Sequence, residues 1–231
     1  MSDDYIPLIT PPEALTEPAL WFAFRKAEIL VVSGAEQPAL PCCLDISEHG
    51  VLAVRHQYLG LYGGKHCYAV ALDESQTLPD GWSALGLRDL FGLVDTTLAV
   101  LSGRAYQLLE WDRNHQYCSR CGTPTQLRTD ERSRTCPACG FTSYPPVSPA
   151  IMILVTHQGK LLLARKAAFP KGRYSALAGF VEPVVRYLVW PRVKLQASGN
   201  ICLDLRRTCK PSRLDEARRF RSVAGYSDVR I

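Results

Sequence analysis

The sequence predicts an α+β protein, because strand-like and helix-like apolar patterns follow one another along the chain. Short stretches rich in β-branched and aromatic residues, separated by Gly, Pro and Ser, occupy the first third. A segment with apolar residues at three- and four-residue steps comes next, and two Cys-x-x-Cys pairs follow it. With 231 residues, the chain is long enough to bury a core in one or two domains.

Composition excludes several classes of protein. Hydrophobic residues make up 47% and charged residues 21%, and the 16 Gly and 16 Pro are not periodic, which argues against a disordered or collagen-like chain. No apolar run reaches the roughly 18 residues that span a bilayer. The start, with Asp3 and Asp4, has the wrong charge for a signal peptide. We therefore expect a soluble cytoplasmic protein without membrane partners.

An N-terminal α/β domain is expected over residues 1–114. Its probable strands are the apolar stretches at 21–24, 29–32, 51–54 and 67–71. From Leu87 the apolar period changes to three and four residues, which predicts one long amphipathic helix that ends near Trp111. Its apolar stripe needs no role beyond packing on the strands.

A zinc ribbon is expected over residues 115–146. Four of the nine cysteines form two Cys-x-x-Cys pairs with 14 residues between them: Cys118, Cys121, Cys136 and Cys139. Gly122 and Gly140 follow the pairs, where a tight turn needs backbone freedom. Four thiolates complete a tetrahedral shell, so the zinc ion would be structural. The alternative is reduced cysteines that are unrelated to metal.

A β-hairpin is expected after the ribbon. Residues 150–156 and 161–165 are apolar and flank a turn at His157 to Lys160, and a further strand is expected over about residues 174–181.

Several of these segments carry a family resemblance. They are the runs Cys118 to Thr125, Cys136 to Gly140, Tyr144-Pro145, Ser148 to Ala150 and Tyr174 to Pro183. In this order they resemble the NADH pyrophosphatase subfamily of Nudix hydrolases. The resemblance covers about residues 85–183 and is weaker in the N-terminal domain. It implies that residues 147–183 begin a Nudix α/β/α sandwich, which this chain would hold in truncated form.

The resemblance also implies an activity and its cofactors. The family consists of homodimeric enzymes that hydrolyse the pyrophosphate of NADH or NAD to nicotinamide mononucleotide and AMP, and that act on NAD-capped RNA. Zinc would be structural, and Mg²⁺ or Mn²⁺ would be the catalytic ion.

Carried over position by position, the resemblance assigns eight residues. The four ribbon cysteines match the zinc ligands. Glu131, Tyr144 and Arg88 match residues on the substrate side, and Ala178 matches a position whose backbone carbonyl binds the catalytic metal. From the residues alone, Tyr144 is equally a half-buried ribbon tyrosine, and Arg88 a surface or helix-capping arginine.

The Nudix box is where this sequence departs from the family. The box places carboxylates on one face of a loop and helix, where they hold divalent cations against the pyrophosphate. Counted from Gly179, its Glu, Arg-Glu and Glu-Glu positions are occupied by Val185, Val193, Lys194, Ala197 and Ser198. No catalytic residue is therefore assigned, and we expect the divalent ion and the activity to be lost.

The last segment, residues 184–231, differs from the rest in charge. It holds 11 Lys and Arg against 4 Asp and Glu, whereas residues 1–183 hold 16 against 18. Our hypothesis is an out-of-frame tail that makes the chain a non-functional truncated product with an incomplete, unstable sheet. The alternative is an authentic basic extension, which would make the protein a zinc-ribbon module that binds nucleic acid. Simple solvated charge also explains the basic runs.

Overall fold

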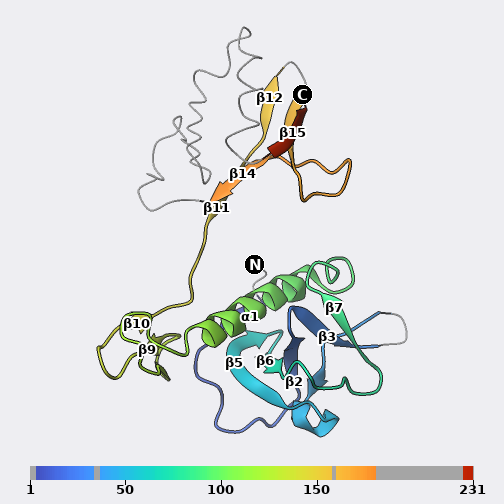
Figure 1. The fold of residues 1–231 in the computed structure, drawn as a ribbon. Helices are drawn as coiled ribbons and strands as arrows, with labels where there is room; N and C mark the ends of the chain where they lie inside the picture. The colour runs from blue at the N-terminus through green and yellow to red at the C-terminus, as the bar shows by residue number, and fades with distance from the viewer. Residues whose placement is uncertain (1–3, 34–36, 158–159, 181–225, 231) are drawn as a thin grey trace. The chain divides into compact units, whose positions relative to one another are not determined.

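A seven-stranded sheet forms the centre of the first of two compact units, residues 1–146 and 147–231 (Figure 1). The computed structural model describes residues 4–33, 37–157, 160–180 and 226–230. Across the sheet the order is β1 (Tyr5–Pro7), β5 (Ala53–Tyr62), β6 (Lys65–Leu72), β2 (Ala19–Arg25), β3 (Glu28–Val32) and β7 (Trp82–Gly86). A short strand, β4 (Cys42–Cys43), pairs with the start of β2. All pairs are antiparallel except β2 with β6.

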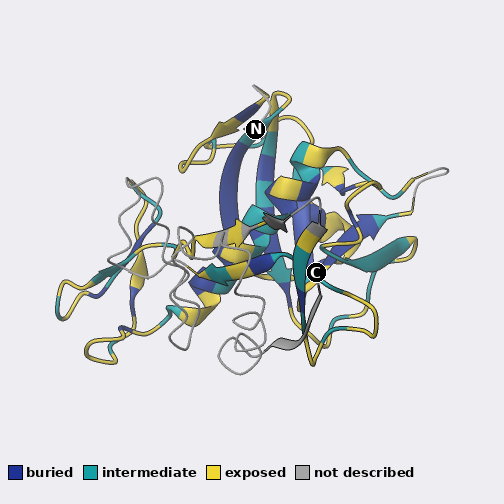
Figure 2. Cartoon of the chain, turned by 90° about the horizontal axis from the view of Figure 1, so that it is seen from above, coloured by how far each residue is buried: buried dark blue, intermediate teal, exposed yellow. Residues whose placement is uncertain are grey.

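Both faces of this sheet are buried, which explains why β2 reads as a continuous apolar run. Successive side chains of β2 alternate between two cores. Phe22 and Phe24 pack on the face covered by helix α1, and Trp21 and Ala23 on the opposite face. There they meet Ile46 of the 3₁₀ helix η1 (Ile46–His49). Figure 2 shows the central strands as largely buried.

Helix α1 (Thr96–Asn114) covers one face of the sheet (Figure 1). Asp95 caps its N-terminus, because its side chain accepts a hydrogen bond of 2.8 Å from the backbone N–H of Thr97. Five of its buried apolar residues join the core of Phe22 and Phe24, and they are Ala99, Leu101, Ala105, Leu108 and Leu109.

The predicted helix start at Leu87 is wrong. Residues 87–94 form turns, in which the N–H groups of Leu93 and Val94 both donate to the carbonyl of Leu90. Gly92 has a φ of 90°, which ends any helical run there. Leu87, Leu90 and Val94 still pack on the core. These three side chains are spaced as they would be in a helix, but a turn places them on the core instead.

Glycine is required at one point in the sheet, where β1 pairs with β5. Gly60 has a φ of 117° and lies opposite Pro7. A Cβ atom at Gly60 would lie 2.1 Å from the carbonyl oxygen of Ile6, so any other residue would push β1 away from the sheet. The pairing of β1 with β5 brings Tyr5 into the core that α1 covers.

The ribbon follows α1 directly as a sheet of three two-residue strands. β9 (Arg134–Thr135) lies between β8 (Gln126–Leu127) and β10 (Thr142–Ser143), and both pairings are antiparallel. Strands this short give little cooperative backbone pairing. Other interactions must fix the ribbon.

The second unit contains a different pairing from the predicted hairpin. β12 (Val155–His157) pairs with β13 (Lys160–Lys166) across the expected turn, whereas β11 (Ala150–Ile153) pairs with β14 (Leu177–Phe180). The predicted first strand is therefore two strands with different partners. β15 (Tyr226–Arg230), from the basic segment, pairs with β13.

Met152 and Phe180 in the β11–β14 pair are exposed, as is Leu154 between β11 and β12. The box positions lie outside the described residues, at Val185, Val193, Lys194, Ala197 and Ser198. Among the helices of the described ranges, none has the length and apolar character to cross a membrane.

Candidate metal centre and substrate-side residues

The four ribbon cysteines converge, and all their Sγ atoms lie within 4.8 Å of one another. Cys118 and Cys139 are 3.6 Å apart, Cys121 and Cys136 are 3.5 Å apart, and Cys121 and Cys139 are 3.6 Å apart. A tetrahedral ion with Zn–S bonds of about 2.3 Å separates its sulfur ligands by roughly 3.8 Å. The donor set and its spacing therefore fit a zinc ion with a closed shell.

Each cysteine pair sits on a tight turn of the same design. The N–H of Gly122 donates to the carbonyl of Cys118, and the N–H of Gly140 donates to that of Cys136. Both glycines have φ values of 70–75°, as the sequence predicted. Cys118 and Cys136 are buried and Cys121 is exposed. Hydrogen bonds with Thr123 lower the pKa of the Cys121 thiol to about 6.

Glu131 and Tyr144, both expected on the substrate side, are in contact on the ribbon. The Tyr144 hydroxyl donates to Glu131 Oε1 at 3.3 Å. Ser133 Oγ donates to the same carboxylate at 2.8 Å, and Arg128 Nε lies 3.4 Å from it. The Tyr144 residue is 58% exposed. An anchored hydroxyl and an exposed ring together make a platform on which a planar base can stack.

The structure does not bring Arg88 to this pair. Arg88 is exposed in the turn after β7, and the ribbon follows the other end of α1 (Figure 1). At about 1.5 Å per residue, the 19 residues of α1 separate the two ends by roughly 28 Å. Any role of Arg88 toward substrate stays a prediction.

Ala178 lies in β14, where it pairs with Met152 of β11. Its role as a metal ligand stays a prediction, since the box residues that would complete that site lie outside the described residues.

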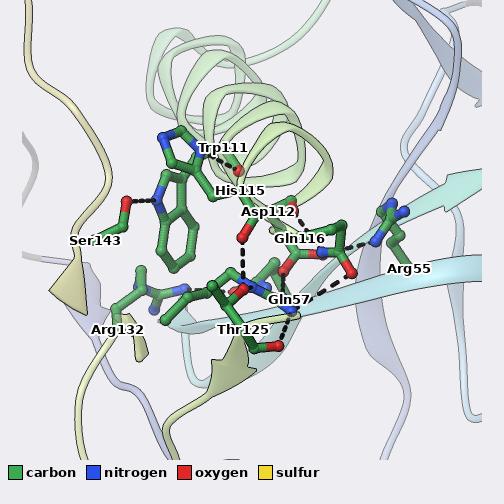
Figure 3. A network of polar contacts seen from close by, with 10 residues as sticks. Arg55, Gln57, Trp111, Asp112, His115, Gln116, Thr125, Arg132 and Ser143 are labelled. Atoms are coloured by element: carbon green, nitrogen blue, oxygen red, sulfur yellow. Dashed lines mark hydrogen bonds and ion pairs between the residues drawn. The ribbon is translucent and has the colours of Figure 1, made fainter. Parts of the chain in front are cut away.

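A buried carboxylate that the sequence analysis missed joins the ribbon to the first domain. Asp112 lies near the end of α1, and its Oδ1 pairs with Nη1 of Arg134 in β9, while its Oδ2 lies 3.3 Å from Nη1 of Arg55 in β5. The Asp112 and Arg134 side chains are only 8% and 9% exposed. One carboxylate therefore links the helix, the sheet and the ribbon (Figure 3).

Further hydrogen bonds complete this network. Arg134 Nε donates to Thr125 Oγ1 at 2.8 Å, and its Nη2 donates to the Thr125 carbonyl at 3.0 Å. Thr125 Oγ1 in turn donates to the carbonyl of His115 at 2.6 Å. On the other side of the helix end, Trp111 Nε1 donates to Ser143 Oγ of β10 at 3.4 Å (Figure 3).

The sequence held a signal for Asp112. It follows Leu108 by four residues and Leu109 by three, so it continues the apolar stripe of the helix with a charge. A carboxylate on the buried stripe of a helix requires a buried cation.

Comparison with known proteins agrees with this architecture. The model of the NADH pyrophosphatase-like rudimentary NUDIX domain matches residues 18–111, and that of the NADH pyrophosphatase zinc ribbon matches residues 113–144. The predicted α+β class and the predicted zinc ribbon are thereby confirmed.

Similar curated proteins are named NAD-capped RNA hydrolase NudC. The protein of Stutzerimonas stutzeri is 42% identical over 128 residues, which cover 55% of this chain and 46% of the relative. That of Deinococcus radiodurans is 35% identical over 71% of this chain and 57% of the relative. That of Chromobacterium violaceum is 33% identical over 77% of this chain and 64% of the relative.

The matches to these three relatives span between about half and two thirds of the length of each relative. The two family models meet at Asp112, whose ion pairs link the two matched regions. Residues 18–111 and 113–144 are therefore similar to the rudimentary NUDIX domain and the zinc ribbon of NADH pyrophosphatases.

Proposed function

We propose that the chain derives from an NAD(H) diphosphatase, a Nudix enzyme that hydrolyses the pyrophosphate of NADH, NAD or an NAD cap on RNA to nicotinamide mononucleotide and AMP. The relatives named NAD-capped RNA hydrolases support this substrate class. The enzyme acts as a homodimer in this proposal, as the family resemblance implies.

The observation that carries the proposal is the contact between Tyr144 and Glu131. The carboxylate holds the phenol oxygen and leaves the ring exposed. A nicotinamide or adenine ring stacks on such a face without being tied to one pattern of base hydrogen bonds. In this proposal, Glu131 orients the tyrosine and Tyr144 holds the base.

The zinc ion in this proposal is held by the four ribbon cysteines and supplies structure. Its closed shell leaves no open position for a water or a substrate. It therefore stabilises the ribbon that carries Glu131 and Tyr144.

We further propose that this chain binds substrate without hydrolysing it. The divalent ion that activates water in a Nudix enzyme needs several carboxylates, and the box positions hold Val185, Lys194, Ala197 and Ser198 in their place. Lys194 brings a positive charge to a position where the metal needs a negative one. Loss of the Mg²⁺ or Mn²⁺ site follows from this charge change.

The first prediction concerns Tyr144. Tyr144→Ala weakens NADH binding by about fivefold or more, because a stacked base loses roughly 1–3 kcal/mol with its aromatic partner. Titration of NADH fluorescence with the full-length chain measures this. The control is Tyr117→Ala, since Tyr117 is 68% exposed on the same ribbon. If both variants bind NADH with the affinity of the parent chain, the proposed stacking of a base on Tyr144 is contradicted.

The second prediction concerns catalysis. The full-length chain releases no AMP from NADH with Mg²⁺ or Mn²⁺ above a no-protein control, while the Stutzerimonas stutzeri relative serves as the comparison enzyme under the same conditions. Measurable AMP release overturns the inactive assignment.

Resequencing the gene across the codons for Phe180 to Arg186 tests whether an out-of-frame tail is the cause of the missing box. A second reading frame that encodes the Nudix box supports the out-of-frame tail, and the absence of such a frame contradicts it.

The third prediction concerns the metal. The purified chain holds one zinc ion, and Cys136→Ser abolishes it, because the buried Cys136 supplies one of four ligands. Zinc is counted by a colorimetric chelator after unfolding. The matched control is Cys42→Ser, a cysteine that is exposed and outside the cluster. A zinc content that is unchanged in Cys136→Ser refutes the assignment.

A further inference from the structure

Two arginines from distant segments both lie near Tyr5 of β1 and affect its charge state. Arg104 lies on α1, and its guanidinium carbon is 5.7 Å from the centre of the Tyr5 ring in β1. Arg132 lies between β8 and β9, and its Nη1 donates to Gln57 Oε1 of β5 at 3.4 Å. Its Nη2 donates to the carbonyl of Leu8 at 3.1 Å. Arg132 and Gln57 are seen together in Figure 3.

Within the part of the chain that the structure describes, these two positive charges lack a negative partner. No carboxylate of the described residues forms an ion pair with Arg104 or Arg132, whereas Arg134 and Arg55 share Asp112. Burial and the nearby Arg104 lower the pKa of Arg132. Burial raises the pKa of the Tyr5 hydroxyl, so Tyr5 stays neutral and supplies no negative charge.

The same place also lacks hydrogen-bond acceptors. In the described part of the chain, two buried side-chain nitrogens have no hydrogen-bond partner, and they are Gln57 Nε2 and Arg104 Nε. Gln57 contacts Arg132 through its Oε1, and Arg104 lies against the Tyr5 ring. A buried donor without an acceptor costs about 1–3 kcal/mol. Two such donors beside two unpaired cations indicate a missing group that is both anionic and rich in acceptors.

We propose that Arg104 and Arg132, with Gln57, form a binding site for a phosphate group. A phosphate supplies the negative charge that the two guanidiniums lack, and its oxygens accept the unused hydrogen bonds. Guanidinium groups present forked donors that match phosphate oxygens in geometry. A mononucleotide, free inorganic phosphate and the 5′ end of an RNA share this chemistry. The site does not depend on the Nudix box.

The site has a structural consequence, since its members come from both family modules. Arg132 belongs to the ribbon, and Arg104 and Gln57 belong to the rudimentary NUDIX domain. A bound phosphate therefore strengthens the link that Arg132 and Gln57 already make between the two modules, separate from Asp112. Binding raises the stability of the chain because only the folded state assembles the site.

The test is calorimetric titration of the full-length, zinc-loaded chain with inorganic phosphate at constant ionic strength. Arg104→Gln and Arg132→Gln each weaken binding by about tenfold or more, because each removes a charge-assisted partner. Arg113→Gln is the matched control, since Arg113 is exposed on the same helix and pairs with the surface residue Glu110. It binds phosphate like the parent chain.

Thermal unfolding gives a second readout that does not depend on heat of binding. Phosphate raises the unfolding midpoint of the parent chain and of Arg113→Gln, and at the same concentration it raises that of Arg104→Gln and Arg132→Gln by much less. Arg132→Lys, which keeps the charge, retains a reduced shift.

RNA probes distinguish the sources of the phosphate. If the terminal phosphate of an RNA occupies the site, a short single-stranded RNA with a 5′ phosphate binds more tightly than the same RNA with a 5′ hydroxyl. Arg132→Gln then removes that difference in affinity. If both RNAs bind equally while the binding of inorganic phosphate still depends on Arg104 and Arg132, the site is one for free phosphate or mononucleotides. The absence of saturable binding by every probe overturns the proposal, as does equal binding by the Arg104→Gln and Arg113→Gln variants.

Discussion

The buried ion pair between Asp112 and Arg134 is the interaction on which the arrangement of the first unit depends. It joins helix α1 to the central ribbon strand, and Arg55 extends it to the sheet. The ribbon has only two-residue strands, so backbone pairing alone holds it weakly. Removing one member of a buried pair costs about 3–5 kcal/mol, because the other charge stays buried. An exposed pair such as Arg113 with Glu110 contributes about 1 kcal/mol or less.

This junction sets the position of every functional group that we assign to the ribbon. The four cysteines fix the two turns, and Asp112 fixes the ribbon on the helix end. Glu131 and Tyr144 then face solvent from a rigid support, whereas Arg132 turns toward Gln57 and the sheet. In the two proposals, neighbouring residues of one loop thus serve two separate sites. A zinc ion held by the four cysteines would stabilise the ribbon that carries both.

The sequence predicted the features that depend on local spacing. The Cys-x-x-Cys pairs and their glycines placed the ribbon correctly, since the metal-binding turn is encoded within a few residues. Periodicity located α1 but extended it to Leu87, because a turn at Gly92 buries leucines at helical spacing. The partners of Asp112 come from positions 55 and 134, and only the tertiary fold brings them together. Spacing along the chain carries no information on such pairs.

Hydrogen exchange of the full-length chain with and without a zinc chelator tests the central claim most directly. If Asp112 couples the ribbon to the domain, removal of zinc speeds exchange in the ribbon and also at the C-terminal turns of α1 and around Arg55 in β5. In Asp112→Asn, which removes the charge, zinc removal affects the ribbon alone. Exchange in α1 and β5 that ignores the chelator in the parent chain contradicts the account.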